Sequence, residues 1–390
     1  MREGWELKKL GDVCSYVKTK YIGEHLPYIG LEHIQSHTGK FLGSLDAHSV
    51  KSSTFHFSDK HLLYGRLRPY LNKVLIPNFE GHCSSEIFPI KMTDSILREY
   101  LFYWLTSSEI VEKIDATWTG ARMPRANMKE VINFEIPIPP LKEQKQIVST
   151  LDKAFNQIDQ AKANLEQNLH NAKELFQSKL NEVFSQRGEG WVEKTLGDVA
   201  NTKGRIGWKG LTAKEYVEKG PLFLSVHSLN YGDYVDFSQA FHITEERYEE
   251  SPEIMLQEND ILICKDGAGI GKLGIVPKLI DNTTINSSLL LIRCKNEVLT
   301  KYLYYNLLSP TFQTIVYSRL SGSTTPHLYQ RDIVTFPIMI PSLNKQKEVI
   351  EILDKFNLGI KNLQIHYQEK LNNLEELKKS ILQKAFRGEL

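Results

Sequence analysis

A glycine-rich segment at residues 266–274 is the stretch of this sequence that most resembles a site for phosphate chemistry. Three of its glycines have the GxGxxG spacing of dinucleotide-binding loops, and Lys272 follows a glycine as the lysine of a P-loop does. Both motifs require more than this. A helix must follow the dinucleotide motif, whereas residues 275–277 predict a strand and its end, and Leu273 stands where a P-loop has Ser or Thr. We therefore interpret the segment as a tight turn that could present backbone amides and Lys272 to a phosphate.

Other signatures of catalysis are incomplete. Adenine methylation requires an Asn/Asp-Pro-Pro-aromatic loop, but the paired prolines Pro139 and Pro140 lie between Ile138 and Leu141, and isoleucine cannot accept a hydrogen bond. The prolines instead predict the end of a strand and the start of a helix. The 12 histidines lack the spacing of metal ligands, and the 4 cysteines include no CxxC pair. We therefore expect no catalytic residues and no metal site.

The segments that must position any binding residues occur twice. The block at residues 4–13 returns at residues 190–199, an offset of 186, and the block at 134–153 returns at 336–355, an offset of 202. Such a repeat is typical of a protein that performs one task on two targets. If a twofold axis relates the copies, the end of the chain should lie near its start, at the place equivalent to residues 187–191.

The sequence between these blocks predicts an α+β fold in four segments. Residues 1–140 and 188–342 contain short β-branched and aromatic runs between Gly, Pro and Asn residues, which predict strands and turns. Residues 141–187 contain neither proline nor glycine, and residues 343–390 have only Gly359 before their last few positions, so each segment predicts one long helix. We expect two pseudo-symmetric α/β globules separated by two long antiparallel coiled-coil helices.

Apolar residues recur at heptad spacing in both predicted helices, which favours a coiled coil. A second seam is thin in the first helix and thick in the second, so the helices should pair with each other and hold the globules at opposite ends of a rod. Packing of each helix on its own globule is the alternative. The main seam has Leu151, Ile158, Leu165 and Ala172 against Leu353, Ile360, Tyr367, Leu374 and Ile381; the second seam has Ala154, Ala161 and Leu175 against Phe356, Leu363 and Leu377.

Composition places the chain among soluble globular proteins. It has 390 residues, of which 41% are hydrophobic, and 48 basic side chains balance 47 acidic ones. No apolar run approaches the roughly 18 residues that span a membrane, and the N-terminus lacks a signal core, so we expect a cytoplasmic protein with reduced thiols and no membrane partner. The charge balance neither supports nor excludes nucleic-acid binding, since a positive surface could still form on folding.

The doubled blocks resemble the DNA-specificity (S) subunits of type I restriction-modification systems. The resemblance rests on the Leu-Gly-Asp-Val run at residues 10–13 and its repeat, on residues 120–124 with 322–326, and on residues 136–145 with their counterpart before the second helix. It covers essentially the whole chain in the family's order. No single motif carries it, but the doubled set is specific.

The resemblance implies that residues 1–140 and 188–342 are target-recognition domains, each of which reads one half of a bipartite, asymmetric site in double-stranded DNA. The helices at 141–187 and 343–390 would then be spacers that set the distance between half-sites. It also implies that two modification subunits dock on the shared frame and supply S-adenosylmethionine and adenine methylation. This chain would then be a non-catalytic subunit with no cofactor of its own, and a motor nuclease subunit could join the complex.

Basic side chains in or near the turns are our candidates for DNA contact. Arginine can bind a guanine edge through two parallel hydrogen bonds, and any of these cations can bind phosphate. Residues 65–69 correspond to the start of the glycine-rich segment, and Lys73 corresponds to Lys272. The candidates are Arg66, Arg68, Lys73, Arg122 and Arg125 in the first domain, and Arg205, Lys265, Lys272, Arg319 and His327 in the second.

Two other functions fit the repeat and the helices. The chain could be the recognition chain of a type II restriction-methylation complex, which differs only in its partners. It could also be a scaffold whose two globules bind proteins or glycans rather than DNA. Salt-sensitive retention on DNA separates the scaffold from both DNA-binding functions, because phosphate contacts make affinity fall steeply with salt.

Overall fold

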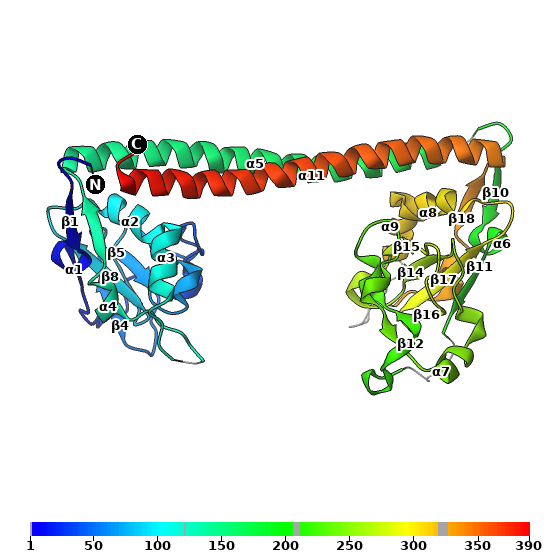
Figure 1. Ribbon diagram of the computed structural model, residues 1–390, viewed down its shortest axis with the longest axis horizontal. Helices are drawn as coiled ribbons and strands as arrows, with labels where there is room; N and C mark the ends of the chain where they lie inside the picture. The colour runs from blue at the N-terminus through cyan, green and yellow to red at the C-terminus, as the bar shows by residue number, and fades with distance from the viewer. Residues whose placement is uncertain (1, 121, 187, 206–210, 319–326) are drawn as a thin grey trace. The chain divides into compact units, whose positions relative to one another are not determined.

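The computed structural model of the chain forms two compact units (Figure 1). The first contains Met1–Glu166 and Gln368–Leu390, and the second contains Gln167–Tyr367. Both are mixtures of helix and sheet, as the sequence predicts. The structure describes residues 2–120, 122–186, 188–205, 211–318 and 327–390.

The first unit is built on a four-stranded antiparallel sheet in the order β2-β8-β5-β6, next to a smaller sheet in the order β3-β7-β4. Strands β3 and β7 are parallel, and β4 runs antiparallel to β7. Helices follow the last strand of the larger sheet. The elements are β2 (Cys14–Tyr16), β3 (Tyr28–Ile29), β4 (Thr54–Phe57), β5 (Leu62–Gly65), β6 (Val74–Leu75), β7 (Gly81–Ser84), β8 (Ile87–Met92), α2 (Arg98–Thr106), α3 (Ser108–Asp115) and α4 (Met128–Val131).

The second unit repeats the strand order of the larger sheet but not that of the smaller one. The last strand in sequence, β7, is central in the small sheet of the first unit, whereas the first strand in sequence, β12, is central in that of the second. Its larger antiparallel sheet has the order β11-β17-β14-β15, and its smaller sheet has the order β13-β12-β16. The central pairing matches the first unit, because Ile261 of β14 faces Ile292 as Leu62 of β5 faces Ile90. The elements are β11 (Ala200–Gly204), β12 (Val217–Leu224), β13 (Phe241–His242), α7 (Glu245–Glu249), β14 (Ile261–Cys264), β15 (Leu273–Ile275), β16 (Thr283–Ile285), β17 (Leu289–Cys294), α8 (Thr300–Leu308), α9 (Pro310–Ser318) and α10 (Gln330–Ile333).

The repeated blocks fold into a short two-stranded ribbon in each unit. Strand β1 (Glu6–Lys9) pairs with β9 (Glu135–Ile138) in the first, and β10 (Val192–Thr195) pairs with β18 (Pro337–Ile340) in the second. The Leu-Gly-Asp-Val runs form one-turn helices, α1 (Leu10–Val13) and α6 (Leu196–Val199). The amides that open these turns donate to equivalent carbonyls, Leu10 to Phe134 and Leu196 to Phe336, both at 2.8 Å.

Two 45-residue helices follow the ribbons, α5 (Leu141–Ser185) and α11 (Leu343–Arg387). A fully buried glutamine fixes the start of each. Gln144 accepts from the Leu97 amide at 2.8 Å and donates to the carbonyls of Ser95 and Pro139 at 2.9 and 2.8 Å. Gln346 makes the same three bonds in the second unit, to Leu299, Glu297 and Pro341.

Within the first unit the two helices lie side by side and run antiparallel. Lys378 of α11 lies 4.7 Å from the Phe155 ring of α5 and pairs with Asp159, while Lys162, further along α5, pairs with Glu375, which comes earlier on α11. Within the second unit, the rings of Phe176 and Phe356 stack with centroids 6.5 Å apart. The predicted pairing is therefore present within each unit. The arrangement of the two globules at opposite ends of a rod stays a prediction.

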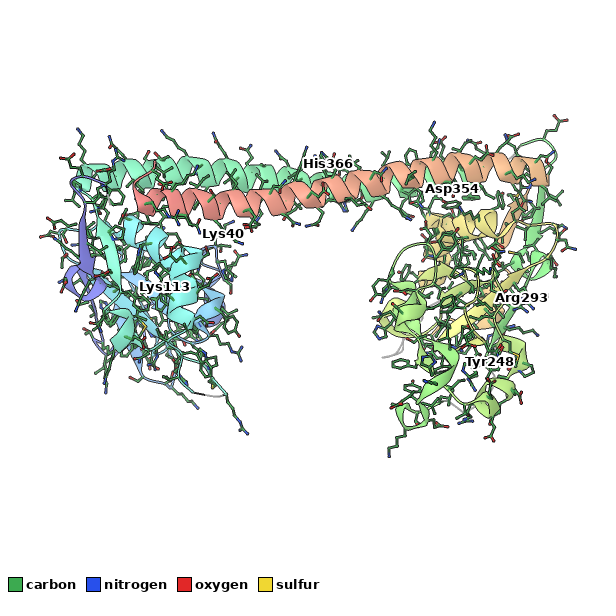
Figure 2. The ribbon with its side chains drawn as sticks, in the orientation of Figure 1. Lys40, Lys113, Tyr248, Arg293, Asp354 and His366 are labelled. Atoms are coloured by element: carbon green, nitrogen blue, oxygen red, sulfur yellow. The ribbon has the colours of Figure 1, made fainter. Side chains whose placement is uncertain are left out.

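The helices also pack on the globules, as the alternative prediction has it. In the first unit, α5 contributes Leu151 and Phe155 to the sheet's hydrophobic core, and α11 contributes Leu382 and Ala385. In the second unit, Tyr305 of α8 donates to Asp354 of α11 at 2.6 Å. Figure 2 labels Asp354 on α11. Within each unit, both helices thus pack against the globule as well as against each other.

The predicted second seam is wrong at three positions. Leu175, Leu363 and Leu377 are 54%, 37% and 47% exposed, so they do not form a buried stripe. In α5 the buried face instead steps through Ala172, Phe176 and Leu180. Successive four-residue steps shift the buried stripe around the helix, so it departs from the strict heptad seam.

The end of the chain lies near its start, as the repeat predicts. The Arg2 guanidinium donates to the Leu390 carbonyl at 3.2 Å and contacts that of Gly388 at 3.4 Å, and it pairs with Glu143 of α5 at 3.2 Å. All of these residues belong to the first unit.

Candidate nucleic-acid interface

In the first unit, main-chain bonds hold residues 66–68 between the turn before β8 and the loop before α4. The Arg66 amide donates to Glu86 and its carbonyl accepts from Ala126, both at 2.9 Å, while the Arg68 amide donates to Pro124 at 2.7 Å. Leu67 faces Arg125 in an isolated bridge. This arrangement brings Arg66 and Arg125, distant in sequence, to one place.

The side chains of Arg66 and Arg125 meet at the Glu86 carboxylate. Arg66 Nε donates to Oε2 at 2.9 Å, and Arg125 donates to Oε1 from Nε at 3.0 Å and from Nη2 at 2.9 Å. The Arg66 guanidinium also lies 5.0 Å from the centre of the Phe88 ring. Burial opposes ionisation of Glu86, but the hydrogen bond from Arg125 and the charge of Arg66 outweigh it and hold the pKa of this carboxyl below its ordinary value.

Arg68 and Arg122 are exposed, and neither side chain has a hydrogen-bond partner among the described residues. Arg68 has a φ of +51°, a left-handed backbone that non-glycine residues seldom adopt. The hydrogen bond from the Arg68 backbone amide to the Pro124 carbonyl holds this conformation, and the next residues, Pro69–Leu71, form a 3-10 turn. Both arginines are thus free to reach a partner.

Lys73 and Arg205 are differently placed. The Lys73 ammonium donates to the Leu31 carbonyl at 2.5 Å, so this side chain already has a hydrogen-bond partner within the protein. Arg205 is only 8% exposed and its guanidinium lies 5.8 Å from the Phe223 ring. Burial and the charge of Arg247 lower the pKa of Arg205. DNA contact by these two residues stays a prediction, and their surroundings favour structural roles.

The glycine-rich segment of the second unit forms the hairpin that joins β14 to β15. A strand is present as predicted, but β15 begins at Leu273, two residues before the predicted start at Ile275, and therefore includes Gly274; it pairs antiparallel with β14. A 3-10 turn at Gly267–Gly269 leads into it, and Lys272 is exposed and donates to Asn230 Oδ1 at 2.6 Å. Because a strand follows the turn, the segment does not have the helix N-terminus on which a dinucleotide loop binds its phosphates.

Lys265 and His327 occupy the places of Arg66 and Arg125. The Lys265 amide donates to Ser288 and its carbonyl accepts from Leu328, both at 2.8 Å, and Asp266 faces His327 in an isolated bridge. Ser288 therefore stands where the first unit has Glu86. The acid lies instead at Asp266, whose carboxylate pairs with His327. Arg319 lies outside the described residues.

Glu86 and Asp266 are the residues that sequence reasoning missed. The carboxylate of Glu86 lies 20 positions from Arg66 and 39 from Arg125, so only the register of β5 and β8 reveals the contact. Asp266 belongs to the segment that the sequence predicts as a glycine-rich turn. Neither carboxylate has a local sequence signal, because the basic side chain that each one binds is distant in sequence.

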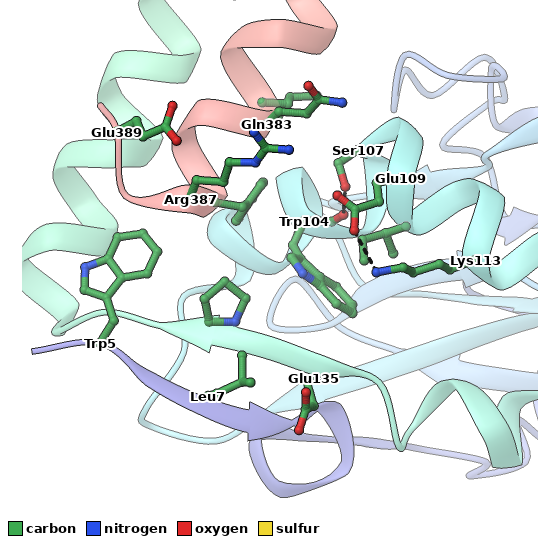
Figure 3. A pocket seen from close by; sticks show the side chains of 14 residues that line it. Trp5, Leu7, Trp104, Ser107, Glu109, Lys113, Glu135, Gln383, Arg387 and Glu389 are labelled. Atoms are coloured by element: carbon green, nitrogen blue, oxygen red, sulfur yellow. Dashed lines mark hydrogen bonds and ion pairs between the residues drawn. The ribbon is translucent and has the colours of Figure 1, made fainter. Parts of the chain in front are cut away.

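A groove of about 640 Å³ lies elsewhere on the first unit, where β1, β9 and α3 meet the end of α11 (Figure 3). Trp5, Trp104 and Leu7 contribute apolar surface, and the Glu109–Lys113 ion pair, at 2.7 Å, lies on one side. None of the candidate DNA contacts lines it. Among the described residues there is no cluster of acidic, His and Cys side chains that could hold a metal ion, and no helix long and apolar enough to cross a membrane.

The fold and the doubled frame agree with a family comparison. The model of the type I restriction modification DNA specificity domain matches residues 2–171 and again residues 188–375. The chain therefore belongs to the family of type I restriction-modification DNA specificity proteins.

Individual relatives are distant in sequence. The type I restriction enzyme EcoDI specificity subunit of Escherichia coli is 29% identical over 183 residues, which cover 46% of this chain and only 40% of that subunit. The MjaVIII specificity subunit of Methanocaldococcus jannaschii is 25% identical over 418 residues, which cover 100% of this chain and 93% of that subunit.

Solved structures share the fold over the whole chain. One, from a study of complex assembly and conformational transition of the type I R-M system, has a TM-score of 0.83 at 22% identity and covers 100% of this chain and 99% of its own. The HsdS subunit from Thermoanaerobacter tengcongensis has a TM-score of 0.61 at 21% identity, with 100% and 98% covered. At these identities the likeness shows the fold alone.

Proposed function

We propose that this chain is the sequence-specificity subunit of a type I restriction-modification enzyme and that its two units each read one half of a bipartite, asymmetric site in double-stranded DNA. The observation that carries this proposal is the doubled site. Both copies of the specificity domain place basic residues at the same main-chain positions, Arg66 and Arg125 in one and Lys265 and His327 in the other. The same frame with different side chains suits two different half-sites.

In this proposal α5 and α11 set the spacing of the half-sites and carry the surface on which two modification subunits dock. The frame supports that role, because Gln144 and Gln346 fix each helix to its globule by identical hydrogen bonds. The modification subunits would supply S-adenosylmethionine and adenine methylation, and a motor nuclease subunit would add cleavage. This chain would hold no cofactor, perform no catalysis and act in the cytoplasm.

The test is DNA retention followed by mapping. The full chain, purified with its modification subunits, should bind duplex DNA, and log affinity should fall linearly with log salt because phosphate contacts release counterions. Mapping methylated adenines in cells that express the complex should give one split motif with two different halves. Salt-insensitive retention would favour a non-DNA scaffold, and a continuous motif would contradict reading by two domains.

A further inference from the structure

We propose that Arg66 reads a guanine in the half-site of the first unit and that Glu86 is the residue that positions it. This inference rests on the proposed function and deepens it. It names the base that is recognised, and it distinguishes the side chain that contacts the base from those that hold it in position. The geometry of the shared carboxylate carries it.

Arg66 and Arg125 differ in the N–H groups that remain available after their hydrogen bonds to Glu86 are made. Arg66 uses only Nε, so both of its Nη groups have no partner among the described residues. Arg125 uses Nε and Nη2 on Glu86, and its Nη1 lies 3.4 Å from the Met123 carbonyl. Guanine presents O6 and N7 side by side in the major groove, and a bidentate contact needs two free N–H donors on one guanidinium. Within the part of the chain that the structure describes, Arg66 keeps both of its Nη groups free for such a contact, whereas Arg125 already engages both of its own.

Arg66 is also held in one orientation. Its guanidinium is fixed at one edge by Glu86 and lies 5.0 Å from the centre of the Phe88 ring, and its side chain is 31% exposed. Arg125 holds the other carboxylate oxygen and thereby fixes Glu86. A guanidinium that is oriented before DNA arrives loses less conformational entropy on binding than a free surface side chain does. Arg125 and Glu86 are therefore positioning residues, and Arg66 is the reader.

Charge gives the assignment a second, independent signature. Two arginines and one carboxylate leave the cluster with one net positive charge. Removing the carboxylate raises the positive charge next to DNA, which should strengthen or preserve non-specific phosphate binding. The loss of a base contact acts in the opposite direction and only on sequences with guanine at the position that is read. A residue with a merely structural role would not produce this pair of effects.

The experiment uses the full chain with its modification subunits and a panel of duplexes in which each base pair of both mapped half-sites is replaced in turn. Competition binding is measured for wild type, Glu86→Gln and Arg66→Lys. The matched control is Glu80→Gln, which makes the same change in the same unit at a carboxylate paired with His56 at 2.7 Å. Arg66→Lys keeps the charge and removes the fork, so it tests the reading if Glu86→Gln does not fold.

We expect Glu86→Gln and Arg66→Lys to lose preference for guanine at one and the same position, roughly 10- to 100-fold, the range of a bidentate contact. All other positions, the second half-site and the control variant should be unchanged, and non-specific affinity of Glu86→Gln should be equal to or above wild type. An even loss across all sequences, effects at different positions, or no loss of preference would overturn the assignment alone. A wild-type complex without salt-sensitive, sequence-selective binding would overturn the proposed function as well.

Discussion

Replacing Gln144 by leucine should destabilise the first unit and leave the second intact. Gln144 is fully buried, and its side chain satisfies one amide and two carbonyls at the point where α5 leaves the β1–β9 ribbon. Leucine has a similar volume but no polar atoms, so the substitution removes hydrogen bonds without opening a large cavity. The change in the stability of the first unit should therefore reflect the loss of the hydrogen bonds and not the loss of packing.

The free energy of unfolding of the first unit should fall by about 3 kcal/mol, about 1 kcal/mol for each of the three buried hydrogen bonds that leucine cannot make. Gln346→Leu should cost the second unit the same, because the three distances of Gln346 are 2.8, 2.9 and 3.0 Å against 2.8, 2.9 and 2.8 Å for Gln144. Gln146→Leu is the matched control. Gln146 is exposed one half-turn along the same helix, so this change should stay within about 0.5 kcal/mol.

Native-state hydrogen exchange is the suitable assay, because a chain with two units need not unfold in one step. In Gln144→Leu, exchange should rise about 100-fold in β8 and α2 and remain at the wild-type rate in β17 and α8. Gln346→Leu should give the reverse pattern. The reasoning would be refuted if Gln144→Leu behaved like Gln146→Leu, or if either variant loosened both units equally.

Three further outcomes are expected. The chain purified alone should transfer no methyl group from labelled S-adenosylmethionine, and activity should appear only with the modification subunit; transfer by the chain alone would contradict the proposed division of labour. Inserting one heptad after Leu165 and another after Tyr367 should lengthen the helices by about 10 Å, about three base pairs, so methylome mapping should show unchanged half-sites and a longer spacer. Finally, the depressed pKa of Glu86 stabilises the fold above the ordinary glutamate pKa of 4.5, and this contribution disappears as pH falls through the lower folded value. Urea melts should therefore show a stability difference between wild type and Glu86→Gln at pH 7 that shrinks below about pH 4.5; a constant difference would assign the effect to packing.

The doubled frame could be predicted because its signals are local. The Leu-Gly-Asp-Val runs and the segments around Gln144 and Gln346 recur in one order, and long stretches without proline or glycine fix the helices. The meeting of the chain's end with its start followed from the same repeat. These features depend on identity between copies, which a sequence shows directly.

The contacts at the candidate site could not be predicted in the same way, because they depend on strand register and on side-chain competition. Nothing in the sequence indicates that the Lys73 ammonium donates a hydrogen bond to the Leu31 carbonyl or that Arg205 is buried. The seam of α5 was misjudged for a geometric reason. Heptad spacing predicts that Leu175 lies on the buried face of α5. Phe176 lies there instead, with its ring 6.3 Å from the ring of Tyr305.

Comparison of the two units shows which features of the candidate site are the same and which differ. The main-chain hydrogen bonds are the same, and the side chains differ. The main-chain bonds that hold residues 66 and 265 agree within 0.1 Å, at 2.9 and 2.8 Å. The acid that pairs with the neighbouring basic side chain, however, lies in the turn before β8 at Glu86 in one unit and in the hairpin between β14 and β15 at Asp266 in the other. Side-chain exchange at a few such positions changes hydrogen-bond donors without moving the backbone. On the proposed function, new half-sites could therefore arise by substitution within each unit while the frame that sets spacing and docking stays fixed.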